Sequence, residues 1–299
     1  MKDVAFLYPP YHKRALDGSM FPLGIGYLIS GVLERNQTFD YINCQLLRQT
    51  DVDTFDSRLA EELSREEYRL IAISSVTSDA IPHLEEIIAA ARAAHPSTPI
   101  IVGGQLVSVD YVGQQIMERF DIDGICRGEG DHALPDLLEY LRAGGCFDEC
   151  GFITTRAHQG VLHRVADIDS LPIPYRTAEL LAQSKLSYRR STNGSSPVPM
   201  ITSRGCPYSC NYCVSGCNCT GKEFRKRSWD SIAREVRYLQ TEYDIHDIGF
   251  YDDCFFWNKN TVNEDILEFQ AQLKAHRCDP FAWQMEIRAD IMAHITRES

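Results

Sequence analysis

Three cysteines lie close together in the second half of the chain, in the stretch RGCPYSCNYC at 204–213. Cys206, Cys210 and Cys213 have the spacing C-x-x-x-C-x-x-C and follow an apolar run that predicts a strand. A disulfide uses cysteines in pairs and a structural zinc site uses four ligands, so three thiols match neither count. Three thiolates can instead hold a metal cluster and leave one corner open for another ligand.

Two further cysteines, Cys217 and Cys219, keep a structural zinc site open as an alternative. Zinc loops usually place two C-x-x-C pairs on separate knuckles, whereas the trio here is contiguous. The remaining cysteines are too scattered to form a cluster, and they are expected to be small buried residues kept reduced: Cys44, Cys126, Cys146, Cys150, Cys254 and Cys278.

The composition is that of a globular protein large enough for two domains, with 299 residues of which 44% are hydrophobic. The net charge of −12 argues against nucleic acid as the main partner, because phosphates would be repelled. The apolar run at the start, in MKDVAFLYPP, is too short for a signal peptide. No run of apolar residues approaches the ~18 residues of a membrane span. These features predict a soluble, cytoplasmic protein.

The first half alternates short apolar runs with amphipathic stretches, which predicts a doubly wound parallel sheet covered by helices. The expected strands are 4–9, 39–44, 69–75, 99–104 and 123–128. The expected helices are 23–35, 80–94, 111–120 and about 131–142.

Small and polar residues follow the third, fourth and fifth expected strands, at 74–79, 103–108 and 128–131. In doubly wound sheets, ligands bind beyond the carboxyl ends of the strands, so these loops are candidate binding loops. Gly103 and Gly104 would let a large ligand approach the backbone, although paired glycines also close tight turns.

The chain is expected to divide into a domain at 1–150, a connecting segment at 151–198 and a second domain at 199–299. Residues 151–165 predict a hairpin turning at Gln159 and Gly160, and the prolines of 166–176 predict an extended linker.

The second domain resumes the alternation of strands and helices. Strands are expected at 199–204, 248–253 and 281–290, and helices at 228–243 and 262–276. Thr261 and Glu264 have the spacing of a capping box at the start of the later helix.

The cysteine loop closely resembles that of the radical S-adenosylmethionine (SAM) family, down to the aromatic Tyr212 before the last cysteine. The resemblance implies a 4Fe-4S cluster on Cys206, Cys210 and Cys213, with SAM on the open iron. It also implies reductive cleavage of SAM to a 5′-deoxyadenosyl radical.

The resemblance also implies contacts between SAM and the ends of two later strands. Asp252 and Asp253 would meet the SAM amino group, and Arg288 is a candidate for its carboxylate. The family's common Gly-Gly-Glu motif is absent here, and acidic pairs at strand ends also serve as caps.

The whole chain is similar in order and spacing to the cobalamin-dependent class of that family. The matching stretches are FPLGIGYL (21–28), the GG loop at 103–104, RGEGD (127–131), LPIPYR (171–176) and the cysteine loop. The resemblance implies an amino-terminal Rossmann-like cobalamin-binding domain followed by a partial (β/α) radical SAM barrel. Its loops would hold cobalamin through Ser74, Thr77, Gly103, Gly104, Gly128, Glu129 and Gly130.

Two features depart from the class pattern. Gln105 and Leu106 replace a common Pro-His after the glycine pair. DIHDIG (244–249) fits the motif of an axial histidine, but His246 precedes a barrel strand, so we interpret this match as coincidence.

The resemblance implies a methyltransferase acting on an unactivated carbon of a small-molecule or peptide substrate, with a flavodoxin- or ferredoxin-type electron donor. A cyclase of the tetrapyrrole type and a non-catalytic metal-binding module are alternatives. A methylthiotransferase would need further cluster cysteines in the first domain, which the sequence lacks at that spacing. Because only three barrel strands are expected, either a partner chain or a further segment completes the barrel, or the barrel is unusually reduced.

Overall fold

The structure is a computed structural model, and it describes residues 1–10, 21–50, 54–184, 197–211, 213 and 223–296. The chain divides into two compact units, Met1–Val165 and Ala166–Ser299. Residues 151–165, expected to open the connecting segment, therefore belong with the first unit, and the expected linker at 166–176 belongs with the second.

The first unit is built on a sheet with the strand order β2-β1-β3-β4-β5-β6. Neighbouring strands from β2 to β5 are parallel, and β6 is antiparallel to β5. The strands are β1 (Lys2–Tyr8), β2 (Phe39–Asn43), β3 (Tyr68–Ser74), β4 (Ile100–Gly103), β5 (Gly124–Cys126) and β6 (Thr154–Thr155). The five parallel strands lie where the sequence predicts them, and the doubly wound arrangement is confirmed.

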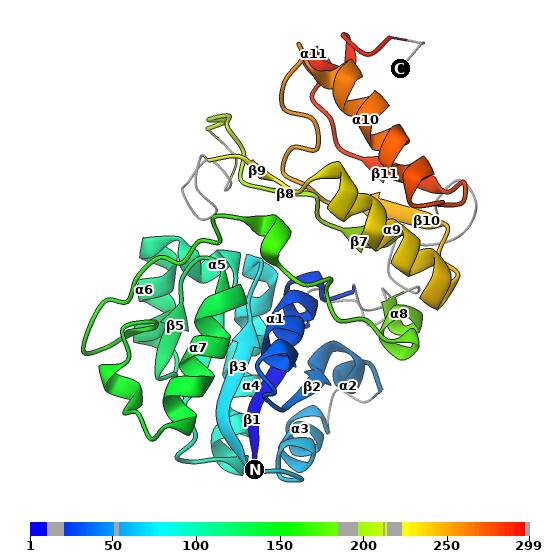
Figure 1. Ribbon diagram of the computed structural model, residues 1–299. Helices are drawn as coiled ribbons and strands as arrows, with labels where there is room; N and C mark the ends of the chain where they lie inside the picture. The colour runs from blue at the N-terminus through cyan, green and yellow to red at the C-terminus, as the bar shows by residue number, and fades with distance from the viewer. Residues whose placement is uncertain (11–20, 51–53, 185–196, 212, 214–222, 297–299) are drawn as a thin grey trace. The chain divides into compact units, whose positions relative to one another are not determined.

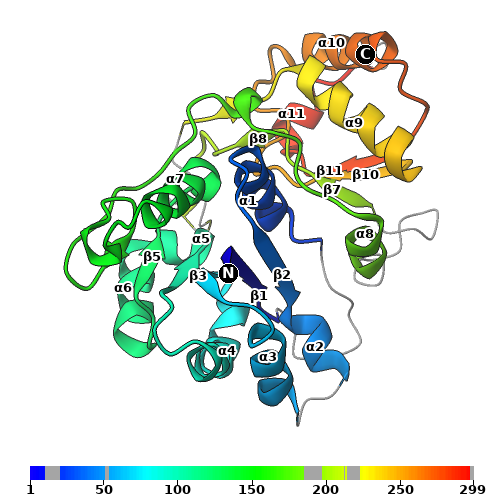
Figure 2. The same cartoon turned by 60° about the horizontal axis from the view of Figure 1, so that its bottom comes forward.

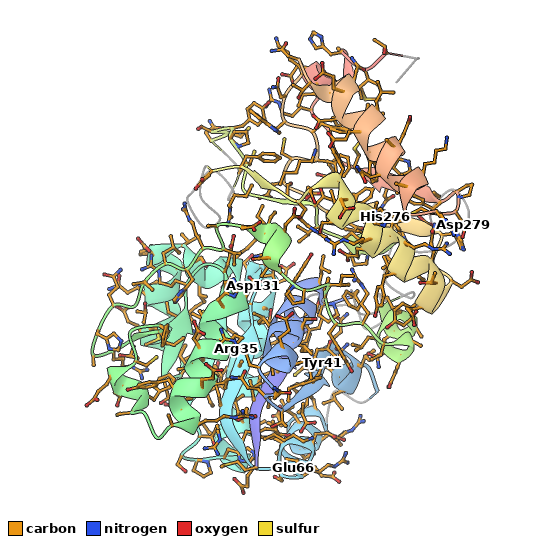
Figure 3. The ribbon with its side chains drawn as sticks, in the orientation of Figure 1. Arg35, Tyr41, Glu66, Asp131, His276 and Asp279 are labelled. Carbon is orange, nitrogen blue, oxygen red and sulfur yellow. The ribbon has the colours of Figure 1, made fainter. Side chains whose placement is uncertain are left out.

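Helices cover both faces of this sheet, as Figures 1 and 2 show. On one face lie α3 (Phe55–Leu63), α4 (Ile81–Ala94) and α6 (Asp110–Arg119), and on the other lie α1 (Leu23–Glu34) and α7 (Gly130–Arg142). Two shorter helices are α2 (Cys44–Thr50) and α5 (Gln105–Ser108). Arg35 at the end of α1 pairs with Asp136 and Glu139 of α7 at 2.9 and 2.7 Å (Figure 3).

The core of the first unit forms where apolar strand residues meet the apolar stripe of α4. Leu84, Ile87 and Ala91 of that helix are fully buried against the sheet. Parallel strands are buried on both faces, which is why their sequences are continuous apolar runs and do not alternate.

The hairpin expected at 151–165 is not formed. Thr155 N–H donates to the His158 carbonyl at 2.9 Å, so the chain turns before Gln159 and Gly160. The returning segment then lies beside the end of β5, where His163 N–H donates to the Arg127 carbonyl and forms a parallel bridge with Gly128. A short 3₁₀ turn at Phe147–Glu149 precedes β6.

The second unit contains a parallel sheet with the strand order β11-β10-β7. Its strands are β7 (Val198–Met200), β10 (Asp247–Phe250) and β11 (Ala282–Met285). Its helices are α8 (Ala178–Ser184), α9 (Trp229–Tyr243), α10 (Val262–Ala275) and α11 (Ala289–Met292). The three parallel strands and two long helices match the expected β/α units of a partial barrel.

The strand expected at 199–204 is divided in two. Its second part, β8 (Ser203–Arg204), leaves the parallel sheet and pairs antiparallel with β9 (Arg225–Lys226), as Figure 1 shows. The strand expected at 281–290 is also shorter, because α11 begins at Ala289.

The segment expected as a linker is anchored in the second unit by a buried arginine. Arg176 pairs with Glu235 of α9 at 2.7 Å, and Arg227 pairs with the same carboxylate. Arg176 also donates to the Pro199 carbonyl at 3.0 Å, which ties the segment to β7. A 3₁₀ turn at Ile168–Ser170 adds a further contact, since Asp169 accepts hydrogen bonds from Ser228 N–H.

The two long helices of the second unit begin differently. The Ser228 side chain caps α9 by accepting from Ser231 N–H at 3.1 Å. Thr261 makes no such capping bond on α10; its hydroxyl donates to Asp265 at 3.0 Å, so the expected capping box is wrong. No helix in the described part of the chain is long and apolar enough to span a membrane.

Candidate functional site

The cysteine loop connects β8 to β9. It lies beyond the carboxyl end of the parallel strand β7, which precedes β8 in the chain. Cys206, Cys210 and Cys213 are each partly exposed, and Cys213 N–H donates to the Cys210 carbonyl at 3.1 Å. Among the described residues, no three His, Cys, Asp or Glu side chains are gathered closely enough to form a metal site. The assignment of the three thiols as ligands therefore stays a prediction.

Three other residues of the sequence prediction lie outside the described part of the loop: Tyr212, Cys217 and Cys219. The structure therefore places neither the aromatic residue before the last cysteine nor the two thiols that could complete a zinc site.

The start of the cysteine loop is held by Asp252, which follows β10. Its buried carboxylate accepts hydrogen bonds from the backbone and hydroxyl groups of both Thr202 and Ser203. Burial raises the pKa of Asp252, while these donors oppose the rise. Both carboxylate oxygens are thus used within the chain, whereas the neighbouring Asp253 is exposed.

The middle and end of the loop contact the same segment after β10. The Tyr208 hydroxyl, between Cys206 and Cys210, donates to the Trp257 carbonyl at 2.9 Å. The Trp257 ring packs against Phe224, which follows the loop, with the ring centroids 5.6 Å apart. The segment 252–257 therefore contacts residues before, within and after the cysteine loop.

Arg288 lies beyond the end of β11, just before α11, and not within the strand as the sequence predicts. Its guanidinium carbon lies 3.8 Å from the centre of the Tyr208 ring. Its nitrogens donate to Asp290 at 3.0 and 3.2 Å. The structure thus brings Arg288 onto the cysteine loop through Tyr208.

Cys254 is a buried thiol beside this loop, and sequence reasoning treated it as a bystander. Burial raises its pKa to about 11, and the nearby Cys206 adds to the rise. The thiol donates to the Phe256 carbonyl at 3.2 Å. Cys254 therefore stays protonated near neutral pH.

Lys226 of β9 is a charged residue that sequence reasoning missed. Its ammonium nitrogen lies 3.4 Å from the centre of the Trp229 ring and 3.5 Å from Asp265. Burial lowers its pKa to about 8, and the Asp265 charge only partly opposes this. The ammonium group also lies near the rings of Phe255 and Phe256, which pack with Phe250 and Phe269 in a buried aromatic cluster.

In the first unit, the predicted binding loops meet at the carboxyl edge of the sheet. Gly104 has a φ of +109°, and a Cβ there would lie 2.4 Å from the Ser75 carbonyl oxygen. Ser75 N–H donates to the Gly103 carbonyl at 2.7 Å. The glycine pair thus closes against the neighbouring strand end, while Thr77 and Gln105 remain exposed at the edge.

A second set of contacts joins the loops after β4 and β5. The Ser108 hydroxyl donates to the Gly104 carbonyl at 3.0 Å and accepts from Gly128 N–H at 2.8 Å. A Cβ on Gly128, which has a φ of +82°, would lie 2.2 Å from the His163 carbonyl oxygen. Glu129 accepts from Val165 N–H at 2.6 Å, and Gly130 begins α7.

The same edge has properties that suit a large ligand with polar groups. The Ser75 hydroxyl is fully buried and has no hydrogen-bond partner among the described residues. Ser74 beside it is half-buried. A Cβ on Gly103 would make only an ordinary van der Waals contact, with Cys126 at 3.8 Å. A buried hydroxyl with no partner is costly, so a ligand group that satisfies it would be favoured.

Comparison with known proteins agrees with both halves of this description. Residues 14–138 match the family model of the B12 binding domain. A solved structure of the cobalamin-dependent SAM radical enzyme OxsB superposes with a TM-score of 0.74 at 19% identity, over 97% of this chain and 39% of that one. The chain therefore carries a B12 binding domain in its first unit and has the fold of a cobalamin-dependent SAM radical enzyme. The predicted fold class, a cobalamin-binding domain followed by a partial barrel, is confirmed.

Two curated proteins are similar to this chain in sequence. An uncharacterized methyltransferase of Pyrococcus horikoshii is 26% identical over 90% of this chain and 57% of its own length. An anaerobic magnesium-protoporphyrin IX monomethyl ester cyclase of Cereibacter sphaeroides is 24% identical over 83% of this chain and 40% of its own length. The chain thus spans about half the length of the curated relatives it matches.

Proposed function

We propose that this chain carries the cobalamin- and SAM-binding parts of a radical SAM enzyme that methylates an unactivated carbon. The observation that carries the proposal is a three-cysteine loop at the end of a parallel β strand, in a chain whose other unit matches the B12 binding domain. The similarity to a methyltransferase over 90% of the chain supports this reaction class.

Cys206, Cys210 and Cys213 would hold a 4Fe-4S cluster, because three partly exposed thiols suit this cluster and leave one iron for SAM. When bound, the cluster supplies the electron for reductive cleavage of SAM. The chain's own residues hold the loop in place: Asp252 binds its start, and Trp257 contacts its middle and its end.

Of the two aspartates assigned to the SAM amino group, Asp253 suits that role better. Its side chain is exposed, and a carboxylate attracts the ammonium group of an amino acid. The Asp252 carboxylate is already surrounded by donors from Thr202 and Ser203, so we assign it to positioning the loop.

The loops after β3, β4 and β5 would hold cobalamin. The buried Ser75 hydroxyl offers a donor to the ligand, and the exposed Thr77 and Gln105 lie at the same edge. Gly104, Gly128 and Glu129 act indirectly, because each shapes or fastens a loop within the chain.

The substrate would be a small molecule or a peptide, and a flavodoxin- or ferredoxin-type protein would supply electrons in the cytoplasm. A partner chain or a further segment would complete the barrel beside the exposed edge of β11. A cyclase of the tetrapyrrole type is the second candidate, because the chain is also similar to such a cyclase over 83% of its length.

Anaerobic reconstitution with iron and sulfide, followed by an assay for 5′-deoxyadenosine with and without added cobalamin, tests the proposal. The wild-type chain should take up iron and cleave SAM, and Cys210→Ala should do neither. Cys146→Ala, a change at an exposed cysteine of the first unit, is the matched control and should retain both. Uptake of zinc without iron would support a structural metal site and refute the enzyme.

The mass of the product separates the two enzyme candidates once a substrate is known. Methylation adds the mass of one CH₂ unit, whereas cyclisation does not. A product without this increment would overturn the methyltransferase in favour of the cyclase.

A further inference from the structure

Tyr208 joins three segments that are far apart in the sequence. Its hydroxyl donates to Trp257 after β10 at 2.9 Å, and Arg288 after β11 covers one face of its ring at 3.8 Å. Tyr208 itself lies two residues from both Cys206 and Cys210. The position of this ring therefore affects the backbone that carries two of the three thiols.

Arg288 is held in its place on the ring by a second contact. Its Nε and a terminal nitrogen donate to the two oxygens of Asp290, so the plane of the guanidinium group is fixed. A guanidinium stacked on an aromatic face gains from both charge and contact. These contacts suit a side chain that holds the Tyr208 ring in place better than one that extends into solvent to bind a ligand.

We propose that Arg288 is a positioning residue that fixes the cysteine loop for cluster binding by clamping Tyr208. The inference rests on the proposed function, since it concerns the same three thiols. It differs from the expectation that Arg288 binds the SAM carboxylate, because the group that Arg288 recognises here is a side chain of the loop itself.

The rate of iron loss to a chelator from the anaerobically reconstituted full chain tests this inference. Arg288→Gln should speed iron loss about fivefold because it removes the stack, and Tyr208→Leu, which also loses the hydrogen bond to Trp257, should speed it at least as much. The double variant should be no faster than Tyr208→Leu alone, because that change already removes the stack with Arg288. Arg288→Lys should restore most of the wild-type rate, since an ammonium group also stacks on tyrosine.

Electron paramagnetic resonance of the reduced cluster reports on its protein surroundings, and thermal unfolding of the cluster-free chain identifies any general loss of stability. Both single variants should show the same altered signal, while the thermal unfolding of the cluster-free chain stays close to that of wild type. Lys274→Gln, an exposed change at the end of α10, is the control and should alter neither signal nor rate.

Three results would overturn the inference. Wild-type rates in both single variants, or additive effects in the double variant, would show that the stack does not position the loop. Weaker SAM binding in Arg288→Gln, with normal iron retention in both variants, would assign Arg288 to SAM. A wild-type chain that takes up no iron is a distinct outcome, because it refutes the proposed function itself.

Discussion

Arg176 and Glu235 form an ion pair with an N–O distance of 2.7 Å in which neither side chain is exposed to solvent. Arg227 binds the other oxygen of the same carboxylate and also donates to the Ile201 carbonyl at 3.1 Å. Burial alone would raise the pKa of Glu235, but the two arginines lower it below its usual value. One carboxylate thus fastens the segment before α8 and the end of β7 to α9.

Replacing Glu235 should destabilise the second unit strongly. Glu235→Gln leaves two buried guanidinium groups without a counter-charge, and we expect a loss of about 3–5 kcal/mol in the free energy of unfolding. Urea unfolding followed by circular dichroism measures this loss. The control is Arg237→Gln on the same helix, which breaks an exposed pair with Asp279 (labelled in Figure 3) and should cost about 0.5 kcal/mol. Equal losses in the two variants would contradict the prediction.

Lys226 should make stability depend on pH in the alkaline range. Its pKa is about 8 in the folded chain against a usual 10.5, so the folded state loses this proton first. Below pH 8 the buried charge destabilises the folded state by its full amount. As pH rises from 8 toward 10.5, the free energy of unfolding should increase by ~3 kcal/mol at most. Unfolding free energies at several pH values measure the change, and Lys226→Met should remove it. The same pH profile in both proteins would refute the assignment.

Asp252 and Asp253 should behave differently although they are neighbours. Asp252→Ala leaves four donors of Thr202 and Ser203 without their acceptor, and we expect a loss of about 3 kcal/mol with reduced iron uptake. Asp253→Ala changes an exposed residue, so stability should stay within about 0.5 kcal/mol. Calorimetric titration of the cluster-loaded chain should instead show weaker SAM binding by Asp253→Ala. Unchanged SAM binding would remove Asp253 from the site.

Gly128 and Gly144 form a matched pair for testing the cobalamin edge. Both have a positive φ, +82° and +84°, but a Cβ on Gly128 would collide with His163, whereas nothing lies within 4 Å of one on Gly144. Gly128→Ala should therefore cost about 3 kcal/mol or more, and Gly144→Ala only the backbone term of about 1–2 kcal/mol. Spectroscopic titration with cobalamin should show weaker binding for Gly128→Ala alone. Equal effects would mean that the contact with His163 does not shape the edge.

The sequence predicts the regular elements well, because their apolar spacing follows directly from burial. The run at 69–75 becomes β3, and the stripe of Leu84, Ile87 and Ala91 becomes the buried face of α4. Buried cysteines are also anticipated at Cys44, Cys126, Cys150 and Cys254, but Cys146 is exposed. Spacing alone locates the cysteine loop at the end of a strand.

Contacts between distant residues are what the sequence could not supply. Nothing local indicates that Arg176 of the expected linker is buried, or that Asp252 uses both oxygens on Thr202 and Ser203. The stacking of Arg288 on Tyr208 joins residues that are far apart in the sequence of the second unit, and only the folded chain brings them together.

The dependence of the cysteine loop on the segment 252–257 limits how this motif can be transplanted. A protein engineer who grafts residues 203–226 onto another α/β scaffold would move the thiols without the carboxylate, the carbonyl and the indole ring that hold them. A successful graft would therefore need to carry at least both segments, together with an arginine placed as Arg288 is on the Tyr208 ring.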